Sequence, residues 1–207
     1  RLVATLARYG YAEKDEITRR YHLGSQVVSL SRSVLTRLPL REAAKPFLRQ
    51  LMERTGECAH LAVPAQGKVL YIDQVESPAS LRVNAQVGTM NPLHCTALGK
   101  ALLAFGDLEP PHEFERYTKR TIHSKSSLLA NLEEIRKVGY AVDDEEFDPG
   151  VRCIAVPIYD FRGKVVGSMG ISGPSSRVTT DKLPHLAAIV VETGKALSER
   201  LAFSRQE

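Results

Sequence analysis

Tryptophan is absent from this 207-residue chain, and aromatic residues make up only 6% of it. This scarcity disfavours a protein that binds single-stranded nucleic acid by stacking bases on aromatic side chains. No apolar run approaches the roughly 20 residues that a membrane-spanning helix needs, and no signal peptide is recognisable. With 43% apolar and 25% charged residues, the composition is that of an ordinary globular chain with one good core and a small satellite domain.

Cysteine is also scarce. The three cysteines, Cys58, Cys95 and Cys153, are odd in number and widely spaced, and none belongs to a CxxC pair. This pattern argues against a disulfide scaffold and against a structural zinc finger, and it favours a reducing cytoplasm.

The basic charge is concentrated at one end of the chain. Residues 1–45 hold nine basic and four acidic residues, a formal charge of +5, whereas the remainder holds 19 basic and 20 acidic residues. The overall charge of +4 is therefore a property of the first quarter, as expected of a segment that faces nucleic acid. A solvated basic surface is the alternative that charge alone leaves open.

The opening segment, RLVATLARYGYAEKDEITRRYHLG, predicts a helix followed by a two-stranded ribbon. Apolar residues share one face of the helix, and Gly10 ends it. Apolar-alternating stretches at residues 11–14 and 17–23 are joined by a charged turn at Asp15-Glu16. This order is typical of the back half of a winged helix, so we expect the front of that domain to precede residue 1.

The periodicity of apolar residues along the rest of the chain predicts an α+β fold. Residues 25–38 and 40–55 read as two amphipathic helices, the first a linker helix. Residues 96–105, 127–138 and 180–201 also read as helices, and strands are expected at 58–63, 68–75, 80–84, 140–142, 151–159 and 165–172. Strands in hairpins and a meander, with helices at both ends, favour a central antiparallel sheet with the helices on one face. The size and element order resemble those of a GAF-like ligand-sensing domain, although periodicity alone does not identify that fold.

Four segments carry a resemblance to a known family: RRYHLG, PLHCTALGKALLA, GYAVDDEEFDPGVRCIAVPI and RGKVVGSMGISGPSSRVT. With them the chain resembles the IclR (isocitrate lyase regulator) family of bacterial transcription regulators over essentially its full length. The resemblance implies a winged helix-turn-helix remnant at residues 1–24, a linker helix at 25–38 and a GAF-like effector-binding domain at 39–207. It also implies operator double-stranded DNA and a small-molecule effector as partners, and a homodimer or a dimer of dimers.

The resemblance further places the chain's start within the DNA-reading helix. Arg1 would face the groove, and Arg19 and Arg20 would lie on the wing near phosphates or the minor groove. Tyr21 would also be a wing residue by the resemblance, but it is expected to pack under the wing. The fragment is not expected to recognise DNA specifically by itself.

The residues themselves suggest a site for a small organic acid. The helix at 96–105 begins after a proline-containing loop, and its first N–H groups lie at the positive end of the helix dipole. Four consecutive acids at 143–146 end a strand, Cys153 lies in an apolar strand, and Ser172 ends the last strand. A carboxylate would suit the helix terminus, and hydroxyl and thiol groups would complete its hydrogen bonds.

The resemblance assigns nine positions to effector binding: Ala97, Leu98, Asp143, Cys153, Gly170 and Ser172 as contacts, and Val83, Asn91 and Val151 as an apolar wall. Two of them depart from the pattern expected of a small 2-oxo acid regulator. Gly170 stands in place of a hydroxyl residue, which removes a donor and is expected to add room, and Asn91 stands in place of an apolar residue. The identity of the effector is therefore open.

Alternative readings accompany these candidates. Cys153 could be a plain core residue, Asp143 could cap a turn or pair with Arg152, and His94 could order its loop. Together, His94, Asp143 and Cys153 could hold an adventitious zinc ion, although the spacing matches no recognised metal motif. No metal, cofactor or catalytic residue is predicted.

Two other classes of function are alternatives to a transcription regulator. An enzyme could use Cys153 as nucleophile, His94 as base and Asp143 as orienting group, but Cys153 lies mid-strand rather than at a helix N-terminus. A stand-alone sensory or oligomerisation module would not need the basic segment. The helix at 27–38 and the hairpin at 58–75 are candidate oligomer interfaces, and activator and repressor are not distinguished.

Overall fold

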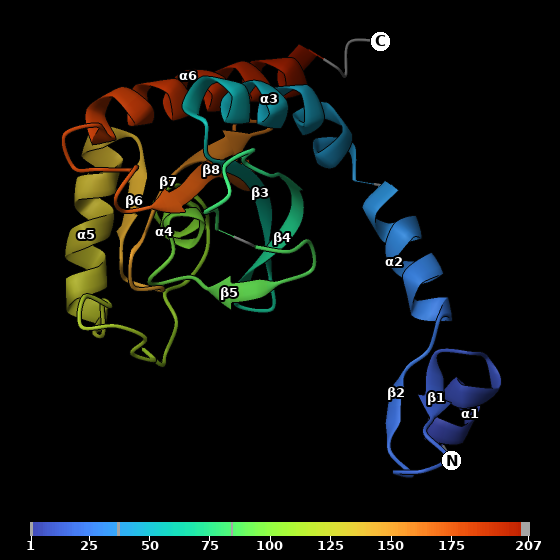
Figure 1. The fold of residues 1–207 in the computed structure, drawn as a ribbon. Helices are drawn as coiled ribbons and strands as arrows, with labels where there is room; N and C mark the ends of the chain where they lie inside the picture. Colours follow the sequence, from blue (N-terminus) through green and yellow to red (C-terminus); the bar gives the residue numbers. More distant parts are fainter. Residues whose placement is uncertain (1, 37, 84, 204–207) are drawn as a thin grey trace. The chain divides into compact units, whose positions relative to one another are not determined.

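A computed structural model describes residues 2–36, 38–83 and 85–203 (Figure 1). The chain divides into two compact units, Arg1–Glu42 and Ala43–Glu207. This division does not separate a linker helix from the segment before it, so the three-part organisation at 1–24, 25–38 and 39–207 stays a prediction. Among the described residues, no helix combines the length and apolar character needed to span a membrane.

The first unit begins with one helix and an antiparallel two-stranded ribbon: α1 (Leu2–Arg8), β1 (Ala12–Lys14) and β2 (Tyr21–Leu23). The second strand is shorter than expected, because Asp15 builds a turn. The Oδ1 atom of Asp15 accepts hydrogen bonds from the backbone N–H groups of Ile17 at 2.8 Å and Thr18 at 2.7 Å. These Asx-turn bonds take the backbone out of the ribbon, so the prediction of a strand from Ile17 is wrong.

Two helices follow the ribbon: α2 (Gln26–Thr36) and α3 (Pro39–Thr55). Pro39 occupies the first helical position of α3, where a missing N–H costs nothing. On α2, the apolar side chains of Val28, Leu30 and Val34 are exposed. The two expected helices are confirmed, within two residues at each end.

The second unit is built on a six-stranded antiparallel sheet: β3 (Cys58–Ala65), β4 (Lys68–Val75), β5 (Met90–Pro92), β6 (Ala141–Asp144), β7 (Val151–Tyr159) and β8 (Val165–Pro174). The strand order is β5-β4-β3-β8-β7-β6. Residues 80–83, expected to form a strand, do not, and β5 lies in the stretch predicted as a loop. Asn84, the last residue of that predicted strand, lies outside the described residues.

The second unit has three further helices: α4 (Ala97–Phe105), α5 (Lys125–Val138) and α6 (Leu183–Phe203). Helices α4 and α6 pack on the sheet, and α5 packs against α4. Helix α4 lies within the curl of the sheet, whereas α6 and the second-unit part of α3 run along its outer side (Figure 1). In β7, Ala155 belongs to the cluster around α4 and α5, whereas Val156 lies beside Gly194 of α6. The helices therefore cover both faces of the sheet, and the expectation that they lie on one face is wrong.

The start of the last helix also differs from the prediction. It begins at Leu183 rather than at Thr180. The backbone carbonyl of Thr179 accepts from the N–H groups of Lys182 and Leu183, both at 3.1 Å, so the residues between form a turn. The α+β architecture with a central antiparallel sheet and flanking helices is confirmed.

Candidate functional site

Three polar side chains of the site lie in one row across neighbouring strands. Asp143 on β6 is opposite Cys153 on β7, which is opposite Ser172 on β8. Opposed residues of antiparallel strands project to the same face of the sheet. The pairing register therefore brings together three residues that are up to 29 positions apart in the sequence.

A second row lies two residues further along these strands. His60 on β3 is opposite Gly170 on β8, which is opposite Ala155 on β7. With a side-chain period of two, this row shares its face with the first. His60 is a buried polar residue on that face and was not predicted from the sequence.

Helix α4 directs its N-terminus at this face. The Thr96 hydroxyl caps it by accepting a hydrogen bond from the Gly99 N–H at 3.2 Å. A Cβ on Gly99 would lie 2.5 Å from the carbonyl oxygen of Leu93, so glycine permits the close approach of the preceding loop. Ala97 and Leu98, in the first turn, line the cavity beside the sheet.

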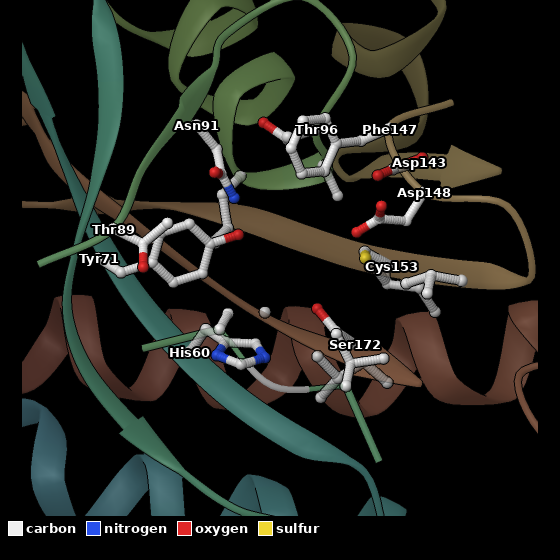
Figure 2. Close-up of a pocket in the computed structure, with 18 residues that line it drawn as sticks. His60, Tyr71, Thr89, Asn91, Thr96, Asp143, Phe147, Asp148, Cys153 and Ser172 are labelled. Carbon is white, nitrogen blue, oxygen red and sulfur yellow. The ribbon is translucent and has the colours of Figure 1, made fainter. Parts of the chain in front are cut away.

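These elements enclose a cavity of about 140 Å³. All nine predicted effector positions line it, namely Val83, Asn91, Ala97, Leu98, Asp143, Val151, Cys153, Gly170 and Ser172. It is also lined by residues that were not predicted as contacts: His60, Tyr71, Ala85, Thr89, Thr96, Phe147, Asp148, Ile154 and Ile171. Figure 2 shows polar side chains on opposite sides of this space, with Asp143, Asp148 and Cys153 across from Tyr71 and Asn91.

Asp143 is an acidic residue of the cavity wall whose carboxyl group has a shifted pKa. Burial raises the pKa of its carboxyl group to about 7, against the lowering effect of a hydrogen bond from the Glu146 backbone N–H to Oδ1 at 2.7 Å. Asp143 therefore caps the turn, as one alternative proposed. The pairing with Arg152 falls instead to Asp144, whose Oδ1 accepts from Arg152 Nε at 2.7 Å. Near neutral pH, the Asp143 carboxyl can either donate or accept a hydrogen bond.

Two of the four consecutive acids, Asp143 and Glu146, are buried. Lys100 of α4 is fully buried and forms a salt bridge with Glu146. The Glu146 carbonyl accepts a hydrogen bond from the Thr121 hydroxyl at 2.6 Å. Because Glu146 also donates its N–H to Asp143, the salt bridge fixes the turn that carries the cavity carboxyl.

The two departures from the family pattern have distinct structural consequences. A Cβ on Gly170 would lie 2.1 Å from the carbonyl oxygen of Ile154 and 2.8 Å from the side chain of Ala155. The neighbouring strand occupies this space, so the expectation that Gly170 adds room is wrong. Asn91 lines the cavity together with Tyr71, so the wall that was expected to be apolar at this position carries polar groups.

Comparison with known proteins identifies the family. The model described as bacterial transcriptional regulator IclR, C-terminal, matches residues 32–199. The chain is 37% identical to the HTH-type transcriptional regulator BhcR of Paracoccus denitrificans, over 98% of this chain and 75% of BhcR. It is 32% identical to the HTH-type transcriptional regulator KdgR of Escherichia coli, over 98% of this chain and 80% of KdgR. The chain belongs to the IclR family.

Solved structures agree with this assignment. The crystal structure of Thermotoga maritima IclR aligns with a TM-score of 0.80 and 32% identity, covering 97% of this chain and 83% of that one. The C-terminal domain of Escherichia coli KdgR aligns with a TM-score of 0.70 and 32% identity, covering 80% of this chain and all of that one. The predicted family resemblance is confirmed, and the protein is a ligand-responsive bacterial transcriptional regulator rather than an enzyme.

The geometry of Cys153 agrees with that assignment. Burial raises the pKa of its thiol, with Asp143 raising it further and a hydrogen bond from Ser172 lowering it. A nucleophilic cysteine needs the opposite shift. His94, the base of the enzyme alternative, has its Nε2 atom 3.0 Å from the Glu115 carbonyl oxygen and packs edge-on against Phe114, so it orders its loop.

Among the residues that are described, no group of three or more His, Cys, Asp and Glu side chains is placed to hold a metal ion.

Arg177 forms a contact that stabilises the fold: its guanidinium forms a bidentate pair with Glu57, at 2.7 and 2.6 Å.

The predicted DNA-binding residues lie in the first unit. Arg1 lies outside the described residues. Arg19 and Arg20 are exposed in the turn of the ribbon, and Arg19 has a φ of 58°. Tyr21, expected to pack under the wing, is 49% exposed, and Lys14 Nζ lies 5.8 Å from its ring centroid. That packing expectation is therefore wrong.

Proposed function

We propose that the effector of this regulator is a small organic acid that binds in the cavity of the second unit. The observation that supports this most directly is that all nine predicted positions, drawn from six separate segments, line one cavity. A cavity of about 140 Å³ is close in size to one of roughly 150 Å³ that accepts benzene. It suits a ligand of about six non-hydrogen atoms.

The N-terminus of α4 would receive the carboxylate. Thr96 caps the Gly99 N–H, and Ala97 and Leu98, which belong to the same first turn, line the cavity. An anion at a helix N-terminus gains roughly 0.3–1 kcal/mol from the dipole, and more where it is partly buried. Because burial raises the pKa of Asp143 to about 7, its protonated carboxyl can donate a hydrogen bond to the ligand instead of repelling it.

A thermal-shift screen of small organic, aromatic and sugar acids tests this proposal. A ligand present at 100 times its dissociation constant stabilises the folded state by about 2.7 kcal/mol. We expect the stabilisation to be lost in Asp143→Asn and Ser172→Ala. Ser126→Ala, the same change on an exposed residue of α5, should retain it. The absence of stabilisation by any acid would contradict the acid-binding pocket.

We further propose that the first unit contacts operator DNA through Arg19 and Arg20, and that ligand binding shifts the population of arrangements of the DNA-binding units. Such a shift requires different ligand affinities in the two arrangements. A dimer or a dimer of dimers is supported by the exposed apolar face of α2, whereas both strands of the β3–β4 hairpin have sheet partners on either side. A monomer by light scattering would overturn the oligomer proposal.

The proposed compartment is the cytoplasm. The three cysteines are free, and Cys58 and Cys95 are buried. Free thiols are typical of a reducing compartment.

A further inference from the structure

His60 lies on the floor of the cavity with its hydrogen-bonding capacity unused. The residue is 1% exposed, and neither Nδ1 nor Nε2 has a hydrogen-bond partner in the structure. Buried polar groups in folded proteins are nearly always hydrogen-bonded. A histidine left unpaired beside a cavity therefore points to a partner that arrives with the ligand.

The charge state of His60 limits which chemical groups of the ligand can pair with it. Burial lowers the pKa of the imidazole to about 4, so the ring is neutral at physiological pH. A neutral imidazole offers one N–H donor and one acceptor nitrogen. A hydroxyl group can satisfy either nitrogen, whereas a second carboxylate could only accept.

The surroundings of His60 fix its position in the cavity. Its ring meets the Tyr71 ring edge-on, with centroids 5.5 Å apart. Tyr71 and Asn91 line the cavity beside it. Figure 2 shows His60 beneath the cavity and Thr96, at the start of α4, on the opposite side. The cavity thus has one polar end at the α4 N-terminus and another at His60.

We propose that His60 is a specificity-determining residue that reads a hydroxyl group on the effector, and that the effector is a hydroxy acid of three or four carbons. This inference rests on the proposed function, in which the carboxylate binds at α4. Among the described lining residues none is Lys or Arg, so hydrogen bonds rather than an ion pair would discriminate between acids. A site built to hydrogen-bond a hydroxyl strongly disfavours the analogue that lacks it.

Isothermal titration calorimetry with glycerate and propanoate tests the inference. The two acids share a three-carbon skeleton, and glycerate adds two hydroxyl groups. We expect the wild-type protein to bind glycerate at least tenfold more tightly than propanoate. His60→Leu should abolish that preference, and His60→Gln, which keeps a donor and an acceptor, should restore much of it.

Ser168→Ala is the matched control. The Ser168 hydroxyl is likewise buried without a partner, but it does not line the cavity, so its loss should leave the preference unchanged. Equal affinity for the two acids, or a preference that survives in His60→Leu, would overturn the role of His60 while leaving the acid pocket intact. Binding of neither acid would overturn the hydroxy-acid class, and stabilisation by other acids in the thermal-shift screen would then separate this failure from that of the proposed function.

Discussion

His60 and Asp143, both on the cavity wall, should change the protein's stability in opposite directions as the pH falls from 7 to 5. Burial lowers the pKa of His60 from 6.5 to about 4. At pH 5 the unfolded chain therefore binds a proton that the folded chain does not, and folding becomes less favourable. Burial raises the pKa of Asp143 from 3.8 to about 7, so at pH 5 the folded chain holds a proton that the unfolded chain lacks. This second effect favours folding.

The two effects have similar size. Each pKa unit corresponds to 1.36 kcal/mol. Between pH 7 and pH 5, linkage gives a loss of about 2 kcal/mol from His60 and a gain of about 2 kcal/mol from Asp143. The contributions of these two groups should nearly cancel in the wild-type protein.

Urea unfolding followed by circular dichroism at the two pH values would separate the contributions, since the chain has no tryptophan for fluorescence. Relative to the wild type, Asp143→Asn should lose about 2 kcal/mol on going from pH 7 to pH 5, and His60→Gln should gain about 2 kcal/mol. Comparing the change within each variant removes the contributions of the other titrating groups. Identical pH dependence in the three proteins would refute the assignment of these shifts to burial in the cavity wall.

Three further predictions concern other contacts. Lys100→Met should destabilise the fold by about 3 kcal/mol, because it leaves the Glu146 carboxylate buried without its partner; urea unfolding at pH 7 checks this, and a loss below about 1 kcal/mol would contradict it. Gly99→Ala should cost about 1–3 kcal/mol by overpacking against the preceding loop, and an unchanged unfolding midpoint would argue against that close approach. Arg19→Ala and Arg20→Ala should each reduce the salt-dependence slope of duplex DNA binding by about 0.9 if each side chain contacts one phosphate, and unaltered slopes would exclude both residues from the interface.

The sequence predicted most of the elements because their patterns are local. The strand at Lys68–Val75 has the predicted type and ends. The helix before Gly139 has the predicted type and C-terminal end, but it begins at Lys125, two residues before the predicted start. The strand expected from Ile17 failed because the Asp15 side chain competes for the backbone through Asx-turn bonds. Alternating apolar residues do not reveal such competition.

The sequence contains a pattern that indicates burial of both faces of the sheet. The segment of β7, VRCIAVPIY, is a nearly continuous apolar run. A sheet with one solvated face would alternate apolar and polar residues, whereas runs of this kind are typical of strands that are covered on both sides. The segment therefore already favoured helices on both faces.

The sequence identified some residues of the site and missed others, and the difference has a physical reason. The family resemblance named nine positions that the fold brings together, but His60 comes from β3, and its place depends on the pairing of β3 with β8. Registers between strands more than 100 residues apart are not encoded in any local pattern. The same holds for Lys100 and Glu146, whose salt bridge joins a helix to a distant turn.

A crystal structure of the protein grown with glycerate would test the central claim most directly. The account predicts one molecule in the cavity, with its carboxylate at the amides of Ala97 and Leu98 and a hydroxyl within hydrogen-bond distance of His60. Glycerate bound elsewhere, or in the cavity with its carboxylate turned away from α4, would contradict the account.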